Sequence, residues 1–186
     1  MCEKRKVVCW IGGIVTFLLA GLLHFVYEWS GNQFVVGLFG AVNESVWEHM
    51  KIFAFAYLIW SVVQYFLCKE ELFSYLRSTL RGLAVIMAVI PVVFYTYTGI
   101  LGTNLFLLDL ATGALATAIA FRVSCKRKEN HSEKTPNKFI TLLGLALLIA
   151  ALLSLTRYPL KIGLFEDPLT GEYGYAANPY AGQFSE

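Results

Sequence analysis

The sequence predicts an all-α protein, a polytopic membrane bundle of about five transmembrane helices with its N-terminus inside and its C-terminus outside. Of its 186 residues, 57% are hydrophobic and only 15% are charged, whereas about 25% are charged in an average soluble domain. The mean hydropathy is +0.59. Apolar runs near 20 residues, the length that crosses a hydrocarbon layer of roughly 30 Å, fill most of the chain and leave no room for a second, soluble domain.

Five apolar segments approach spanning length, and they form one predicted bundle over residues 1–156. The third and fourth segments are separated only by a short stretch with Gly and Asn, which predicts a tight helical hairpin, and Pro91 is expected to kink the third. The remaining residues, 157–186, form a predicted exoplasmic tail. The predicted spans are 7–27, 48–67, 82–101, 104–122 and 139–156.

The basic residues determine the predicted orientation. With the N-terminus inside, twelve of the fifteen lysines and arginines lie on the cytoplasmic side, as the positive-inside rule requires. Only Lys51, Arg157 and Lys161 fall outside. All four cysteines lie at or near the inner ends, where thiols stay reduced, so no disulfide is expected. They are Cys2, Cys9, Cys68 and Cys125. The predicted location is the cell membrane.

The connections between the spans have recognisable patterns. Residues 68–81 carry apolar positions near helical spacing, which is typical of a short interfacial helix on the cytoplasmic face. Residues 122–138 are a basic inner loop near anionic headgroups. The Gly-rich, apolar stretch 30–42 predicts a re-entrant or surface-lying loop. In the tail, Asp167-Pro168 and Thr170-Gly171 predict a small hairpin, which is either a lid over the outer mouth or a surface tail.

Polar side chains converge on the outer leaflet. Ionisable residues are costly inside a membrane and are functional candidates for that reason. Asp109 falls about 8 Å below the outer boundary of its predicted span, at 1.5 Å per residue. The pairs His24 and Glu28, and Ser45 and His49, have i,i+4 spacing and so share a helix face. The outer set is His24, Glu28, Asn43, Glu44, Ser45, Glu48, His49, Tyr97, Asp109 and Arg157.

These residue types favour a site for Zn²⁺ or another divalent metal. The predicted ligands are His24, Glu28, His49 and Asp109. In a hydrolytic site of this kind, a metal-bound water is the nucleophile and a spare carboxylate is the general base. The candidate base is Glu48, with Ser45 as a second catalytic candidate. Further polar residues expected around the site are Asn43, Glu44, Tyr97 and Arg157.

Local structure offers a second explanation for some of these residues. Ser45-x-x-Glu48 before an apolar run is a capping-box pattern in which Glu48 bonds the backbone. Asn43 is also a good N-cap residue. His24 and Glu28 form a hydrogen-bonded interfacial pair in this interpretation, and Asp109 has a polar partner on the second or third span instead of a metal.

Two strings support a resemblance to a known family. NESVWEH, at residues 43–49, and LFEDPLTGEYG, at residues 164–174, resemble an uncharacterised family of small multi-pass bacterial membrane proteins, a domain of unknown function. This resemblance implies a single membrane domain and brings no activity with it. The spacing of Ser45 and His49 is also similar to one motif of the membrane metal hydrolases that include alkaline ceramidases. Those proteins have seven helices and a late HxxxH pair, and this chain has neither.

Three functions remain open from the sequence. The first is a metal-dependent membrane hydrolase acting on a lipid-like substrate, the second is a solute-binding or transport subunit, and the third is a structural protein whose polar clusters only join helices. The expected partners are the lipid bilayer and a lipid-like or small-molecule ligand that arrives from the outer side, with no role for nucleic acid. The sequence predicts neither the substrate nor the oligomeric state, and it leaves open whether the protein is an enzyme.

Overall fold

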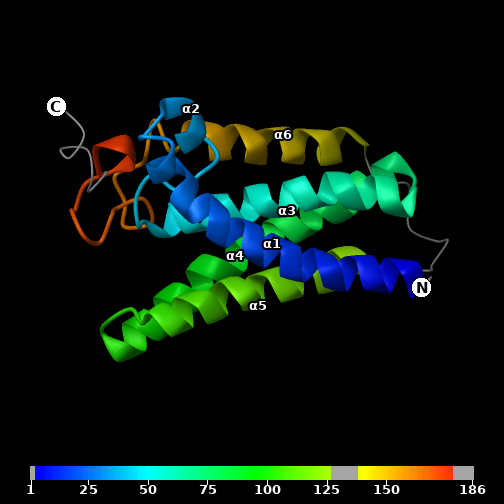
Figure 1. Ribbon diagram of the computed structural model, residues 1–186, viewed down its shortest axis with the longest axis horizontal. Coiled ribbons are helices and arrows are strands. Elements are labelled where there is room, and N and C mark those ends of the chain that lie inside the picture. Colours follow the sequence, from blue (N-terminus) through cyan, green and yellow to red (C-terminus); the bar gives the residue numbers. More distant parts are fainter. Residues whose placement is uncertain (1–2, 127–137, 178–186) are drawn as a thin grey trace.

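The fold is all-helical in the part of the chain that the computed structural model describes, residues 3–126 and 138–177. The long helices lie side by side, and the start of α1 is at the opposite end of the bundle from η1 (Figure 1). The elements are α1 (Glu3–Trp29), α2 (Phe34–Gly37), α3 (Val46–Cys68), α4 (Leu72–Leu101), α5 (Phe106–Cys125), α6 (Lys138–Ser154) and the short 3₁₀ helix η1 (Gly174–Ala177).

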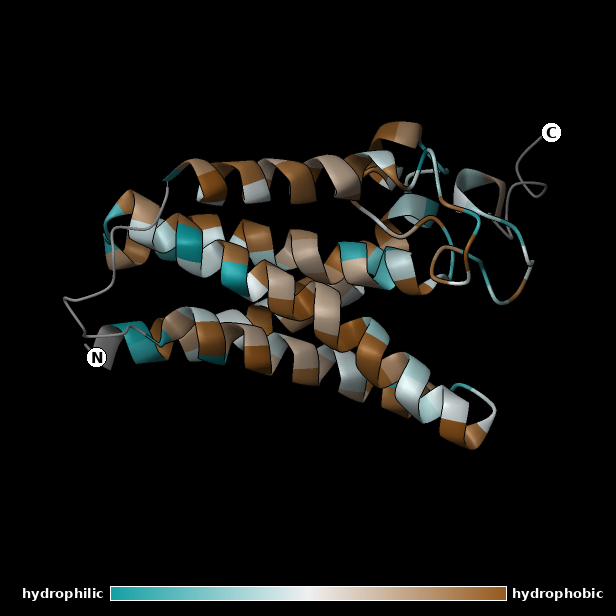
Figure 2. Cartoon of the chain, turned by 180° about the vertical axis from the view of Figure 1, so that it is seen from behind, coloured by the Kyte–Doolittle hydropathy of each residue, from teal (hydrophilic) through white to brown (hydrophobic). Residues whose placement is uncertain are grey.

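Four of the described helices are long and apolar enough to cross a membrane, namely α1, α3, α4 and α5. Apolar residues cover most of α6 and the α4–α5 hairpin (Figure 2). The fifth predicted span corresponds to α6, which is apolar but has only 17 residues, a length of about 26 Å at 1.5 Å per residue. It packs against α4. The inside-to-outside orientation stays a prediction.

The predicted separate interfacial helix over residues 68–81 is wrong, because residues 72–81 are the first part of α4. That helix runs without interruption from Leu72 to Leu101, passing through Pro91. Lys69 turns the chain in the left-handed conformation after α3. Glu71 then caps α4 by accepting from the backbone N–H groups of Phe73 and Ser74, which lowers the pKa of its carboxyl group. Only Gly82 separates residues 72–81 from the apolar run that follows, and a single glycine inside a helix costs about 1 kcal/mol without ending it, so one helix forms.

The core forms where small residues let the helices approach. A Cβ added to Gly82 of α4 would lie 2.1 Å from the Tyr57 hydroxyl of α3, and one added to Gly113 of α5 would lie 2.2 Å from the Phe53 ring. Such close contacts are the usual way in which membrane helices gain packing energy. The buried residues of α4 lie between Tyr75 and Ile90 and those of α5 begin at Thr112. We call the end of the bundle that the sequence predicts to face outward the outer end. There the α4–α5 hairpin stands apart from the rest of the bundle (Figure 1).

Cys9 and Cys125 form a disulfide between α1 and α5, so the expectation of reduced thiols is wrong for this pair. The two residues are 116 positions apart, and no spacing pattern pairs them in the sequence. They meet because α1 packs beside α5 at the end of the bundle where α1 begins. The Gln64 side chain of α3 lies 3.8 Å from both sulfur atoms and donates to them. Cys2 lies outside the described residues, as do residues 127–137 of the predicted inner loop.

The tail folds back onto the outer end of the bundle. Glu166 and Tyr173 form an isolated antiparallel bridge around a turn, as the predicted hairpin requires. The Trp47 N–H at the start of α3 donates to the Leu164 carbonyl at 3.0 Å, and the Trp47 and Phe165 rings lie 4.8 Å apart. Stretch 30–42 contains α2 and is tied to α1 by a hydrogen bond from Ala41 to Leu23. The described tail and this loop therefore enclose the first turns of α3.

Candidate functional site

The site begins at the N-terminus of α3, whose cap is Ser45, one of the two N-cap residues that the sequence offered. The Ser45 hydroxyl accepts from the Glu48 N–H at 3.3 Å. The other half of a capping box is absent, because the Ser45 N–H donates to the Asn43 side chain at 2.9 Å and leaves nothing for the Glu48 carboxylate. This cap fixes the direction of the first helical turn. The same cap sets the direction in which the His49 side chain points, because His49 lies one helical turn after Ser45.

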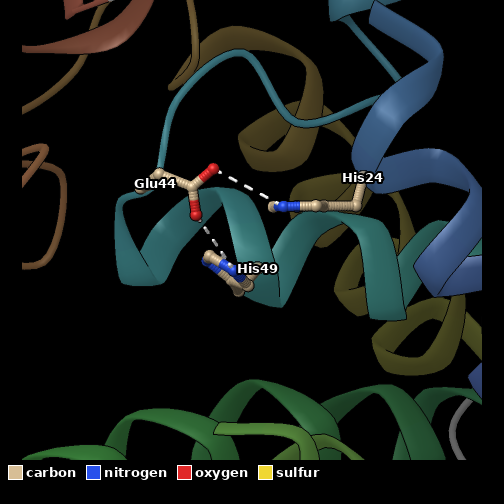
Figure 3. Close-up of side chains that lie close together, drawn as sticks. All are labelled: His24, Glu44 and His49. Atoms are coloured by element: carbon tan, nitrogen blue, oxygen red, sulfur yellow. Dashed lines mark ion pairs between the residues drawn. The ribbon is translucent and has the colours of Figure 1, made fainter. Parts of the chain in front are cut away.

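Three side chains from separate parts of the chain meet beside this cap (Figure 3). His24 comes from α1, Glu44 from the loop before α3, and His49 from α3. The His24 Nε2 atom lies 3.5 Å from one Glu44 oxygen, and the His49 Nε2 atom lies 3.8 Å from the other. The two imidazole centroids are 5.2 Å apart. We call these three residues the outer triad.

The hydrogen bond that orients His49 suits metal ligation. The His49 Nδ1 atom lies 2.9 Å from the Ser45 carbonyl, which only accepts, so Nδ1 carries a proton and Nε2 is the ring nitrogen that faces Glu44. A carbonyl that orients an imidazole in this way is the usual outer partner of a metal-bound histidine. On His24, Nε2 faces Glu44, and the buried Nδ1 has no hydrogen-bond partner among the described residues.

The spacing of the triad is close to that of a metal centre. Each residue offers a ligand atom, and the three atoms lie within 4.8 Å of one another. Tetrahedral zinc with bonds of 2.0–2.1 Å holds its ligands about 3.4 Å apart, so shifts of a few tenths of an ångström to about one ångström would close the site. The side chains are 23%, 40% and 33% exposed for His24, Glu44 and His49. Two imidazoles and one carboxylate with an open side are a ligand set typical of catalytic zinc.

Glu48, predicted as the general base, is instead held in a buried ion pair. Its carboxylate lies 2.6 Å from the Lys51 ammonium, and the two side chains are 1% and 0% exposed. Lys51 also donates to the Gly37 carbonyl at 2.8 Å and to the Thr156 hydroxyl at 2.9 Å. Glu48 accepts from the Val42 N–H at 3.0 Å and from Thr156 at 2.7 Å. All three ammonium protons are therefore used, and the pair joins α3 to the α2 loop and to the segment after α6.

The structure does not bring Asp109 to the outer triad. The Tyr97 hydroxyl donates to one Asp109 oxygen, and the Asn104 amide lies 3.4 Å from the other. Tyr97 is on the third predicted span. The structure therefore agrees with the alternative interpretation in which Asp109 has a polar partner on the second or third span. Asp109 and Tyr97 belong to the outer end of the α4–α5 hairpin, which diverges from α2 and the tail (Figure 1).

The two remaining predicted residues, Glu28 and Arg157, do not belong to the triad. Glu28 is one turn from His24 on the same face of α1, and its charge acts on the His24 imidazole. Arg157 follows α6 and stacks over the Tyr158 ring, 5.6 Å from the ring centroid. Neither residue belongs to the group of three ligand atoms found among the described residues.

Several residues of the site were missed by sequence reasoning. Lys51 was assigned only an outer location, although its i,i+3 spacing from Glu48 is a pairing pattern. For Asp167, which the sequence placed in the turn of the tail, the missed feature is its contact with the site: it is 0% exposed and accepts from the Glu44 N–H at 3.1 Å. Thr156 carries no local pattern that marks it. Tyr175 donates to the Phe34 carbonyl at 2.9 Å, and burial raises its pKa to about 12, so it remains a neutral donor.

A model of a protein family, described as a family of unknown function (DUF6512), matches residues 2–175. The matched region contains both strings on which the family resemblance rests, and it includes the outer triad, the ion pair and the tail. No curated protein and no solved structure matches the chain. The family match therefore establishes kinship over nearly the whole sequence and assigns no activity.

Proposed function

The chain belongs to this family of unknown function, and we propose that it is a metal-dependent membrane hydrolase acting on a lipid-like substrate. The observation that carries the proposal is the outer triad, in which two imidazole nitrogens face the two oxygens of one carboxylate at 3.5 and 3.8 Å. In this proposal His24, Glu44 and His49 hold a zinc ion. Glu44 takes the place that the sequence assigned to Glu28 and Asp109.

A zinc ion in such a site supplies hydroxide near neutral pH, because it lowers the pKa of a bound water to about 7. The triad provides three protein ligands and a partly exposed side on which a fourth ligand fits. Glu48 is unavailable as a base, since both of its oxygens are engaged in the buried network. We assign the role of general base to Glu28, which lies one turn from His24 on α1.

The depth of the triad supports a lipid-like substrate. His24 lies five residues before the end of α1 and His49 three residues after the start of α3, which is about 4–8 Å below the helix ends at 1.5 Å per residue. The bonds that join acyl chains to headgroups lie near this boundary of a bilayer. Phe25 packs edge-on against His24 and stacks on Trp29, and both aromatic rings are exposed where lipid would contact them.

A transport role is less well supported by the position of the triad. A transporter site belongs near the bilayer midplane, where it can open to either side in turn, whereas the triad lies at the outer ends of α1 and α3. A purely structural role would use a protonated histidine paired with Glu44 to join the two helices. It would need no metal and would leave no hydrolytic product.

Lipid hydrolysis by protein stripped with EDTA and reloaded with Zn²⁺ tests the proposal. We expect zinc-dependent release of fatty acid from vesicles of phosphatidylethanolamine and phosphatidylglycerol, or from vesicles doped with an N-acyl sphingosine, measured by mass spectrometry. H24A, E44Q and H49A should each lower the rate by about 100-fold or more. D109N, which alters a carboxylate outside the triad, is the matched control and should retain the activity.

Two results would contradict the proposed hydrolysis. The first is the absence of zinc-dependent release from all of these lipids. The second is release that survives both the chelator and the three triad variants. Zinc-dependent stabilisation without any product would favour the binding or transport alternative instead.

A further inference from the structure

We propose that Asp167, in the C-terminal turn, is a positioning residue that holds the metal ligand Glu44 in place. This inference rests on the proposed metal site. It makes the tail part of the site instead of a surface segment, and it gives a role to the LFEDPLTGEYG string, which the proposed chemistry does not otherwise use. Asp167 touches neither the metal nor the substrate in this account and acts only through the backbone of Glu44.

The two oxygens of Asp167 have separate partners. One oxygen accepts from the Leu169 N–H at 2.7 Å and from the Thr170 N–H at 3.1 Å, which is the ordinary bonding of an aspartate within its own turn. The other oxygen accepts from the Glu44 N–H at 3.1 Å, across 123 positions of sequence. The turn needs only the first oxygen. The second is directed to a residue of the site.

Burial makes this second bond strong and specific. Asp167 is 0% exposed, and a buried carboxylate is stable only when its oxygens accept hydrogen bonds. A bond from a backbone N–H to a charged carboxylate is roughly twice as strong as one between neutral groups. The Asp167 carboxylate therefore fixes the position of the Glu44 backbone N–H, and with it the Cα atom from which the Glu44 side chain extends.

A second bond fixes the same loop from the other side. The Asn43 amide donates to the Gly174 carbonyl at 2.9 Å, while its oxygen accepts from the Ser45 N–H. Glu44 is thus held between two contacts to the tail. It precedes α3 and has a side chain 40% exposed, so packing alone constrains the side chain only in part. Fixing a ligand before the metal arrives lowers the entropy lost on binding.

Asp167→Asn tests the inference with little change of shape. The amide oxygen of the new side chain can keep the bonds from the Leu169 and Thr170 N–H groups. Its NH₂ group then faces the Glu44 N–H, and because both groups are donors, the hydrogen bond to Glu44 is lost. We expect the zinc Kd of the full-length protein to rise about 10–100-fold, the range typical of lost outer-sphere support. The visible spectrum of the Co²⁺-loaded protein should also change, because the carboxylate ligand is displaced.

The neighbouring carboxylate provides the matched control. Glu166→Gln alters a side chain that, among the described residues, accepts one hydrogen bond, an exposed one from the Tyr173 hydroxyl at 3.1 Å, and it should leave the zinc Kd and the Co²⁺ spectrum unchanged. Asn43→Asp removes the other loop-to-tail bond and keeps the acceptor for Ser45. It should weaken zinc binding in the same way, and it carries the test if D167N does not fold.

A double-mutant cycle separates positioning from general destabilisation. If Asp167 acts through Glu44, D167N should change the zinc Kd by less than about twofold in the E44Q background. A wild-type Kd in both D167N and N43D would overturn the inference alone, as would an equal loss in E166Q or a full loss in the E44Q background. A wild-type protein that binds no zinc would overturn the proposed function and, with it, this inference.

Discussion

Replacing Lys51 by methionine is expected to lower the free energy of unfolding by about 3–5 kcal/mol. The change removes the ammonium group that lies 2.6 Å from Glu48 in a site where both side chains are at most 1% exposed. It leaves a buried carboxylate with only the Val42 N–H and the Thr156 hydroxyl as donors. An uncompensated buried charge costs far more than a surface ion pair contributes.

Thermal and denaturant unfolding in detergent measure this effect. Lys161→Met, at an exposed lysine of the tail, is the matched control and should stay within about 0.5 kcal/mol of wild type. The double variant E48Q/K51M removes both charges and should recover much of the loss. A single K51M variant as stable as wild type would show that the ion pair does not hold the outer end of the bundle together.

The second large effect is expected for Gly174→Ala, which combines backbone strain with a clash. Gly174 has φ of +59°, and a Cβ there would lie 2.5 Å from the Thr156 carbonyl oxygen. The left-handed conformation costs a residue with a side chain about 1–2 kcal/mol, and overpacking adds about 1–3 kcal/mol. Because the Gly174 carbonyl also accepts from Asn43, the tail should loosen where it meets the loop that carries Glu44.

Gly171→Ala measures the backbone penalty without a clash, so the difference between the two alanine variants gives the cost of the clash at Gly174. Gly171 has a similar φ of +71°, and a Cβ there would meet nothing within 4 Å. We expect it to cost only the backbone penalty of about 1–2 kcal/mol, measured by the same unfolding experiments. Equal destabilisation by the two alanine variants would show that contact between Gly174 and the segment after α6 is unimportant.

The helices could be predicted because each depends on residues near one another in the sequence. Apolar runs placed α1, α3 and α5 within a few residues of their described bounds, and Ser45 was recognised as a cap because its bonds are made three residues away. The interpretation of residues 68–81 as a separate helix failed, although it too was based on residues near one another in the sequence. Its amphipathic pattern is real, but one long helix is favoured over two separate ones because Gly82 alone does not end a helix and a second helix would need its own nucleus.

The site could be predicted only in part, because its decisive contacts are long-range. His24 and His49 were identified from their rarity in membrane spans, and the structure brings them together. The partners that organise them come from distant segments, with Lys51 and Thr156 105 positions apart, and Glu44 and Asp167 123 apart. Nothing local shows that the tail returns to the first turn of α3. The same limitation concealed the disulfide between Cys9 and Cys125.

The central claim is that His24, Glu44 and His49 form a metal centre, and calorimetric titration of the EDTA-stripped protein with zinc chloride tests it most directly. The account predicts one zinc ion per chain for wild type and for D109N. It predicts that H24A, E44Q and H49A each weaken binding by about 100-fold or more. A stripped, folded wild-type protein that takes up no zinc, or binding that all three triad variants retain, would contradict it.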